Sequence, residues 1–267
     1  MRHHTPPLAL IVVLVLSACG SSSSTTRTTT HAQATHTLAA TGASTDALKP
    51  TRADFKRLVR VHRGSGLSAH IVGLDNAPLP QAIQTLSTDL NQFWSGEFAR
   101  SGVSWPPVKD LLVQSAAVQT GCAGRPSVGP SDPWYLCDAA NGATFYWTLP
   151  WIQQNIATDP GNANLAINMA ELWSFHIQNL FGFTKRLQQS KLSKGAWAEQ
   201  AVCLTGVYVA SLNNRQLLEQ ADVQTVGSFV DALSSVDGIG SPDVNPVQLR
   251  QAFSAGFSGG QPGACEA

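Results

Sequence analysis

The sequence has few charged residues and no excess of either sign. Of its 267 residues, 13% are charged, with 17 Lys and Arg against 17 Asp and Glu. A protein that binds nucleic acid through phosphate contacts needs a net positive charge or a basic stretch. The composition therefore argues against nucleic-acid partners, and the low charge also argues against an acidic or basic tail.

The apolar run near the N-terminus is too short to span a bilayer, which takes about 20 residues. The run Leu8–Leu16 follows the basic start Met1–His4, an arrangement typical of a secretory signal peptide. It ends at Leu16-Ser17-Ala18-Cys19, which resembles the bacterial lipobox. The resemblance implies a signal peptide over residues 1–18, cleavage before Cys19 and lipidation of the Cys19 thiol. The alternative is an ordinary signal peptide, because Ser17-Ala18 also suits a small-residue cleavage site.

Residues 19–50 are predicted to be the lipidated cysteine followed by a disordered tether. The stretch Gly20–Leu48 contains 14 Ser and Thr in 29 residues. Such a composition buries too little apolar surface to offset the entropy of ordering the chain. As a flexible coil the tether would place the folded domain roughly 30 Å from its anchor.

Five cysteines leave one without a partner if the others pair. With Cys19 assigned to the anchor, four remain in a chain exported to an oxidising space, where an even set indicates two disulfides. Three pairings exist, and we predict Cys122–Cys137 and Cys203–Cys265. The sequence has no C-x-x-C spacing, which argues against a zinc–cysteine cluster.

The pattern of apolar residues predicts a single helix-dominated α+β domain with a small sheet, over residues 51–267. Residues 51–79 give no clear pattern. The predicted helices run from Pro80 to about Ser101, over Asn164–Gln189, Gly195–Leu218 and Asp222–Val236, and from a cap at Asn245-Pro246 to Phe257. Strands are predicted at Leu111–Val118 and Ala143–Ile152, with a loop over Gly124–Pro133.

Several landmarks, in their order along the chain, resemble the bacterial neutral zinc metallopeptidases. They are Trp94 and Phe98, Trp105-Pro106-Pro107, Cys122, the strand Ala143–Trp147, the helix Ala170–Leu180, the segment Glu199–Tyr208, and the final Arg250, Phe253, Gly256, Phe257, Gly260 and Cys265. Together they span Pro80 to Cys265. The resemblance implies a zincin-like metallopeptidase fold.

The departures from that family fall on its chemistry. In an H-E-x-x-H helix two His side chains at i and i+4 bind zinc, and the Glu acts as general base. In this sequence Glu171 occupies the position of the first motif His, and Leu172 occupies that of the motif Glu. Phe175 occupies the position of the second motif His. The later Glu ligand and Asp of the family fall on Ala198 and Val202. The resemblance therefore implies an inherited scaffold with no matching ligand or base, and no cofactor.

A rebuilt metal site is the alternative. It would use zinc, with His176 and some of Glu171, Glu199, His62 and His70. Glu171 and His176 are about 140° apart around a helix, which disfavours a shared metal ion. The simpler expectation is a partly buried, hydrogen-bonded core histidine at position 176, and a Glu171 that is solvated or paired with Arg or Lys.

Other catalytic patterns are missing: the sequence has neither a G-x-S-x-G elbow nor a phosphate-binding loop with Lys. The tryptophans Trp147, Trp151 and Trp173 either pack in the core or line the former cleft as a ligand or partner surface.

We expect a lipoprotein held at the extracytoplasmic side of a bacterial cell membrane by its lipid anchor. Its metallopeptidase-like domain would be inactive and act by binding a peptide, a protein or another envelope component. A divergent active metallopeptidase with a relocated metal site is the alternative, and a surface lipoprotein without a small ligand is a third hypothesis.

Overall fold

The computed structural model describes residues 77–122, 124–139, 142–156, 163–218, 220–233 and 244–265. Its elements are α2 (Leu79–Arg100), β1 (Val108–Val113), β2 (Val118–Cys122), β3 (Arg125–Val128), β4 (Tyr135–Ala139), β5 (Gly142–Thr148), α3 (Leu149–Asn155), α4 (Ala163–Leu180), α5 (Phe183–Gln188), α6 (Lys194–Asn214), α7 (Gln220–Leu233), α8 (Pro246–Gly259) and the 3-10 helix η4 (Pro262–Cys265). The expected signal peptide and tether, with Cys19, and also His62 and His70, lie outside the described residues.

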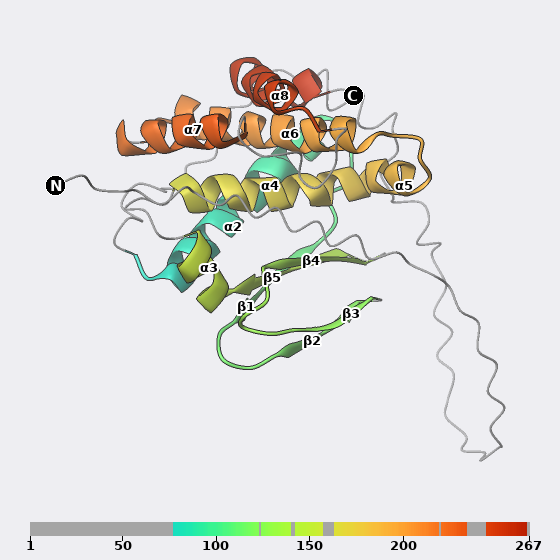
Figure 1. Ribbon diagram of the computed structural model, residues 1–267, viewed down its shortest axis with the longest axis vertical. Coiled ribbons are helices and arrows are strands. Elements are labelled where there is room, and N and C mark those ends of the chain that lie inside the picture. Colours follow the sequence, from blue (N-terminus) through green and yellow to red (C-terminus); the bar gives the residue numbers. More distant parts are fainter. Residues whose placement is uncertain are drawn as a thin grey trace, which may run out of the picture.

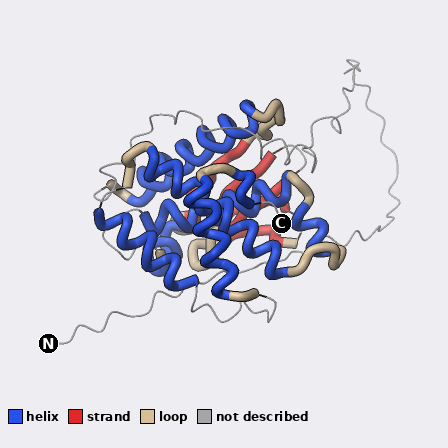
Figure 2. Tube along the Cα trace, turned by 90° about the horizontal axis from the view of Figure 1, so that it is seen from above, coloured by secondary structure: helices blue, strands red, loops and turns tan. Residues whose placement is uncertain are grey.

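The elements form one helix-rich α+β domain, as predicted. Strands β1, β5 and β4 make a three-stranded sheet in that order, with β1 parallel and β4 antiparallel to β5. Strands β2 and β3 form a separate antiparallel pair below this sheet (Figure 1). Helix α4 lies between the sheet and α6, and α8 packs on the far side of α6 (Figure 1). In the view from above, the helices cover the strands (Figure 2).

Several predicted boundaries differ from the structure, and proline or glycine explains two of them. The predicted strand Ala143–Ile152 ends at Thr148, because Pro150 suits the first turn of α3 and has no N–H for a strand ladder. The predicted helix Asn164–Gln189 is broken at Gly182, whose φ of 73° lies in the left-handed region.

The strand predictions were less accurate than the helix predictions. The predicted strand Leu111–Val118 spans the end of β1, the connection to β2 and the first residue of β2, and the predicted loop Gly124–Pro133 contains β3. Strand β4 was not predicted. The helix from Pro80 is confirmed as α2, and the cap at Asn245 is confirmed by its Oδ1, which accepts from the Val247 N–H at 2.9 Å.

Both predicted disulfides are confirmed. Cys122–Cys137 joins β2 to β4, and Cys203–Cys265 joins α6 to η4. The second bridge closes a loop of 62 residues, a constraint worth roughly 4 kcal/mol in the loop-entropy account.

A column of parallel aromatic rings connects α4 to the sheet. Trp173 of α4 stacks on Phe145 of β5 with ring centroids 4.8 Å apart, and Phe145 stacks on Trp147 at 5.4 Å. On its other side Trp173 stacks on Trp105 at 6.0 Å. Offset stacking of this kind adds about 0.5–1.5 kcal/mol per pair to the burial of the rings.

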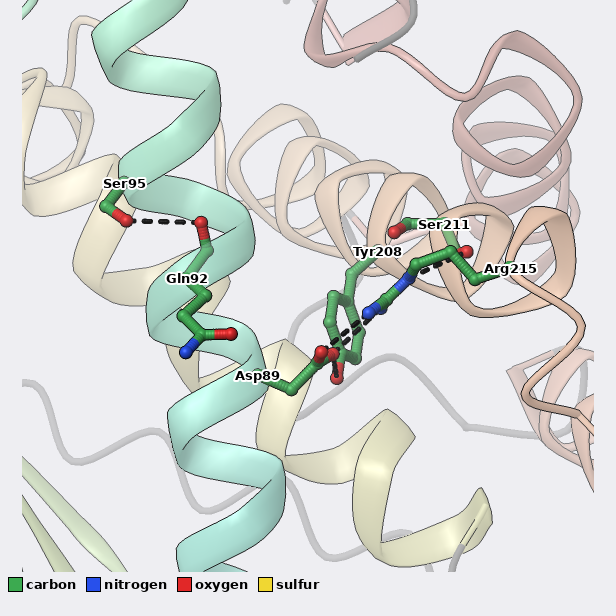
Figure 3. A network of polar contacts seen from close by, with 6 residues as sticks. All are labelled: Asp89, Gln92, Ser95, Tyr208, Ser211 and Arg215. Atoms are coloured by element: carbon green, nitrogen blue, oxygen red, sulfur yellow. Dashed lines mark hydrogen bonds and ion pairs between the residues drawn. The ribbon is translucent and has the colours of Figure 1, made fainter. Parts of the chain in front are cut away.

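A buried ion pair between Asp89 of α2 and Arg215, the residue that follows α6, connects these two helices (Figure 3). Both Arg215 Nη atoms donate to the Asp89 carboxylate, at 2.6 and 2.8 Å, and the Tyr208 hydroxyl donates to it at 2.7 Å. Asp89 is 1% exposed. Removing one partner of such a pair would leave an uncompensated charge and cost on the order of 3–5 kcal/mol.

Helices α6 and α8 approach each other at two glycines. A Cβ on Gly256 would lie 2.0 Å from the Cys203 carbonyl oxygen, and one on Gly206 would lie 2.5 Å from that of Phe253. Both of these contacts are with backbone atoms, so a rotamer change cannot relieve them. The interface therefore requires residues without a side chain.

We predict that Gly256→Ala lowers the free energy of unfolding by more than about 2 kcal/mol, because the two helices have to separate to admit the methyl group. The matched control is Gly227→Ala in α7, where a Cβ meets nothing within 4 Å. The free energy of unfolding of this control is expected to rise by about 0.5–1 kcal/mol, because alanine has a higher helix propensity than glycine. Urea denaturation of both variants checks the pair, and equal stabilities would contradict the close packing of α6 and α8.

Candidate functional site

The positions matched to the metallopeptidase motif lie on α4, which is buried on nearly every side. Of its 18 residues 15 are buried. Leu172 is 7% exposed, and the ring of Phe175 stacks on Trp197 of α6 with centroids 4.8 Å apart and planes 5° from parallel. The positions matched to the general base and the second His are thus occupied by packed apolar side chains.

The two later motif positions are also packed. Ala198 is 5% exposed and Val202 is 1% exposed. Both belong to an apolar cluster with Leu249 and Phe253 of α8. Neither side chain carries a donor atom for a metal, so the residues present do not fit a zinc site at the matched positions.

Glu171 is buried, and the expectation that it would be solvated or paired with Arg or Lys was wrong. It is 6% exposed, and burial raises its pKa from 4.5 to about 7. Within the described residues its carboxyl group has no hydrogen-bond or ionic partner. Nearby on the same helix, the Ser174 hydroxyl is already bonded to the Ala170 carbonyl, at 2.9 Å.

His176 is buried and hydrogen-bonded, as predicted. Its Nδ1 lies 2.6 Å from Asp138 Oδ1, and the Asn179 amide donates to the other oxygen of Asp138. The His176 ring is nearly perpendicular to the ring of Trp105, with centroids 5.4 Å apart. Its Nε2 is buried without a hydrogen-bond partner in the part of the chain that is described.

The sequence did not indicate Asp138 as the partner of His176. Asp138 follows Cys137 in β4, the strand that pattern analysis missed. The two residues are 38 positions apart, and only the pairing of β4 with β5 under α4 brings them together. The imidazole lies against the aromatic column and Asp138 lies in β4, so this pair connects α4 to β4.

Glu199 lies in a different place, in an open pocket of about 330 Å³ between α6, α8 and η4. The pocket is lined by Glu199, Gln200, Cys203, Gln248, Gln251, Ala252, Ala255, Ala264 and Cys265. Neither Glu171 nor His176 is part of it. The three weak catalytic candidates therefore do not share one site.

No group of three or more His, Cys, Asp or Glu side chains that could hold a metal ion occurs among the described residues. A rebuilt zinc site would need at least three converging donors. The candidates His62 and His70 lie outside the described residues. The described residues therefore do not form the relocated zinc site that the alternative hypothesis requires.

The three tryptophans proposed as cleft lining differ in exposure. Trp147 and Trp173 are each 0% exposed, and the Trp147 indole donates to Asp110 Oδ1 at 2.7 Å, so both are core residues. Trp151 is half-buried and lies against another half-buried tryptophan, Trp134, with ring centroids 5.8 Å apart. Trp134 was not among the residues proposed for this role.

Comparison with known protein families finds no match for this chain, and comparisons with curated proteins and with solved structures find none either.

Replacing Glu171 by Gln should stabilise the protein at neutral and alkaline pH. Between its unfolded pKa of 4.5 and its folded pKa of about 7, Glu171 binds more protons in the folded state. The free energy of unfolding therefore falls as pH rises through this range. Glu171→Gln removes that loss. Relative to the wild type, its free energy of unfolding is therefore expected to be higher by as much as about 3 kcal/mol at pH 8 and to be almost unchanged at pH 4. Urea denaturation at several pH values measures the difference.

The matched control is Glu199→Gln, the same substitution at a half-buried position in the pocket. This control separates the effect of burial at position 171 from the effect of the Glu-to-Gln change itself. Parallel stability curves for the wild type and Glu171→Gln would contradict a buried, unpartnered carboxyl group.

Proposed function

We propose that this protein is a lipid-anchored lipoprotein on the extracytoplasmic side of a bacterial membrane. Its zincin-like, metallopeptidase-related domain hydrolyses no peptide bonds and acts by binding a peptide, a protein or another envelope component. The observation that carries the proposal is the stack of Phe175 on Trp197, at 4.8 Å, where the family resemblance expects a zinc-binding His.

The chemistry of the neighbouring positions supports the loss of catalysis. Leu172 takes the place of the general base, and a leucine side chain accepts no proton from water. Glu171 has a pKa of about 7 because of its burial, so a large fraction of it is uncharged at neutral pH and a poor metal ligand. This part of α4 is occupied by packed apolar side chains, namely Leu172, the fully buried Trp173 and Phe175.

Two observations support an exported, anchored chain. The two disulfides are of the kind that persists in oxidising compartments. The N-terminal sequence combines a short apolar run ending at Leu16 with a cysteine three positions later, Cys19. Among the described helices, none has both the length and the apolar character needed to cross a membrane.

We predict that the full chain, extracted in mild detergent, contains far less than one zinc ion per chain and has no chelator-sensitive activity on casein. Elemental analysis and hydrolysis with and without 1,10-phenanthroline measure these two properties. One zinc per chain, removed by the chelator together with hydrolysis and lost in His176→Ala, would instead establish the divergent peptidase.

Cys19→Ser should release the protein from the membrane. The wild-type chain, expressed in a bacterium, is expected in the detergent phase after Triton X-114 partition and to carry a lipid on its N-terminal cysteine by mass spectrometry. The variant is expected in the aqueous phase, because it lacks the thiol that receives the lipid. Ser22→Ala, a change in the predicted tether, is the control and should partition like the wild type. An unlipidated wild-type chain would refute the anchor.

A further inference from the structure

The pocket between α6, α8 and η4 lies apart from the motif positions on α4, because α8 packs on the far side of α6 (Figure 1). The disulfide Cys203–Cys265 joins α6 to η4 and so holds two of its walls together. The close approach of α6 and α8 at Gly206 and Gly256 fixes the position of the third wall. The pocket is thus built into the packing of the helices. Its volume of about 330 Å³ lies at the lower end of the range for ligand pockets.

Three side chains in this pocket have polar groups that are free to bind a ligand. Glu199 is half-buried on α6, and among the described residues it is the only charged one that lines the pocket. Gln248 and Gln251 line it from α8, where a spacing of three residues places them on one face of the helix. In the described part of the chain these three side chains have no hydrogen-bond or ionic partner. They offer a carboxylate and two amide groups.

The rest of the lining is apolar or already satisfied. Gln200 is 1% exposed, its amide donates to the Cys265 carbonyl at 3.3 Å, and its Oε1 accepts from the Gln178 amide at 3.2 Å. The remaining lining residues are Ala252, Ala255 and Ala264, with Cys203 and Cys265 of the disulfide. These small groups form a surface against which a hydrocarbon stem can pack. The pocket therefore combines free polar groups with an apolar wall.

The free groups determine the charge of a matching ligand. A carboxylate without a partner favours a cation, because a charge-assisted hydrogen bond is stronger than a neutral one. A metal ion needs more such donors, and no group of three or more His, Cys, Asp or Glu side chains that could hold one occurs among the described residues. The ligand is therefore expected to be an organic cation.

The number of acceptors favours an ammonium group over a guanidinium group. An ammonium has three N–H donors and no acceptor. Three side chains of the pocket can accept from it, Glu199 through its carboxylate and Gln248 and Gln251 through their amide oxygens. A guanidinium has five donors in one rigid plane. Three acceptors drawn from two helices suit that arrangement less well.

We propose that this pocket binds the side chain of a lysine presented by a peptide segment. Glu199 pairs with the ammonium group, the two glutamines accept from it, and the alanine-lined wall contacts the four-carbon stem. The proposal rests on the proposed function, in which the domain acts by binding, and it names the chemical group that is bound.

The test follows the fluorescence anisotropy of the tripeptide Ala-Lys-Ala as the detergent-extracted full chain is added. The peptide carries fluorescein on its N-terminus and an amide at its C-terminus, so the lysine supplies its only ammonium group. Saturable binding is expected. Acetylation of the lysine Nε keeps the stem but removes the charge, and it should weaken binding roughly 3- to 10-fold.

Two variants change the pocket in different ways. Glu199→Gln removes the charge without changing the shape, and it should weaken binding of the lysine peptide roughly 3- to 10-fold. Its control is Asp132→Asn, which removes the same charge from an exposed position between β3 and β4. Ala255→Leu should also weaken binding, because the larger side chain occupies part of the pocket. Its control is Ser254→Leu, at an exposed neighbour that does not line the pocket. Both controls should bind like the wild type.

The melting temperature of each variant shows whether it is folded, and each pocket variant remains informative if the other is not. The proposal is overturned if the lysine and acetyl-lysine peptides bind equally, or if folded Glu199→Gln or Ala255→Leu binds like the wild type. It is also overturned if Asp132→Asn weakens binding as much as Glu199→Gln, or if Ala-Arg-Ala binds more tightly than Ala-Lys-Ala. None of these outcomes affects the zinc, hydrolysis or partition measurements, so the proposed function stands or falls separately.

Discussion

The burial of α4 between the sheet and α6 is the constraint on which the rest of the structure depends, because 15 of its 18 residues are buried. On a helix enclosed to this extent, a buried polar group without a hydrogen-bond partner is costly. The Ser174 hydroxyl donates to the Ala170 carbonyl, the Gln178 amide donates to the Trp197 carbonyl at 2.7 Å, and His176 Nδ1 is paired with Asp138. His176 Nε2 and Gln178 Oε1 have no hydrogen-bond partner among the described residues. The Glu171 carboxyl group has no partner among the described residues either, and its burial raises its pKa to about 7.

The same enclosure is the basis of the proposed loss of catalysis. An active H-E-x-x-H helix needs one open face at which water and substrate reach the metal. Here that stretch of α4 is closed by the Phe175–Trp197 stack and by Leu172. What connects the layers is packing, such as the aromatic column through Trp173, and not a metal-binding arrangement of side chains. Binding at the surface is therefore the kind of activity that the proposed function assigns to this domain.

Local signals explain which elements pattern analysis found. Helix α2 shows helical spacing of apolar residues and α8 has a capping Asn245, so both are visible in the sequence. Strands β3 and β4 are four and five residues long, and neither has a periodicity that a short window can detect. Among the candidate site residues, His176 was placed correctly as a core histidine. Its partner Asp138 was missed because their contact crosses 38 positions of the chain.

The sequence alone determined the helix-rich α+β class, since that class follows from local periodicity. It left three pairings of the four cysteines possible, and the fold brings together the pairs that were predicted. The sequence also determined which side chains occupy the motif positions, and so which chemistry they lack. Only the tertiary structure decided that Glu171 is buried without a partner, that Trp147 and Trp173 are core residues, and that Trp134 lies against Trp151. The physical reason is that exposure and long-range contact depend on how α3, α4 and the strands pack together, and no property of a single segment records that packing.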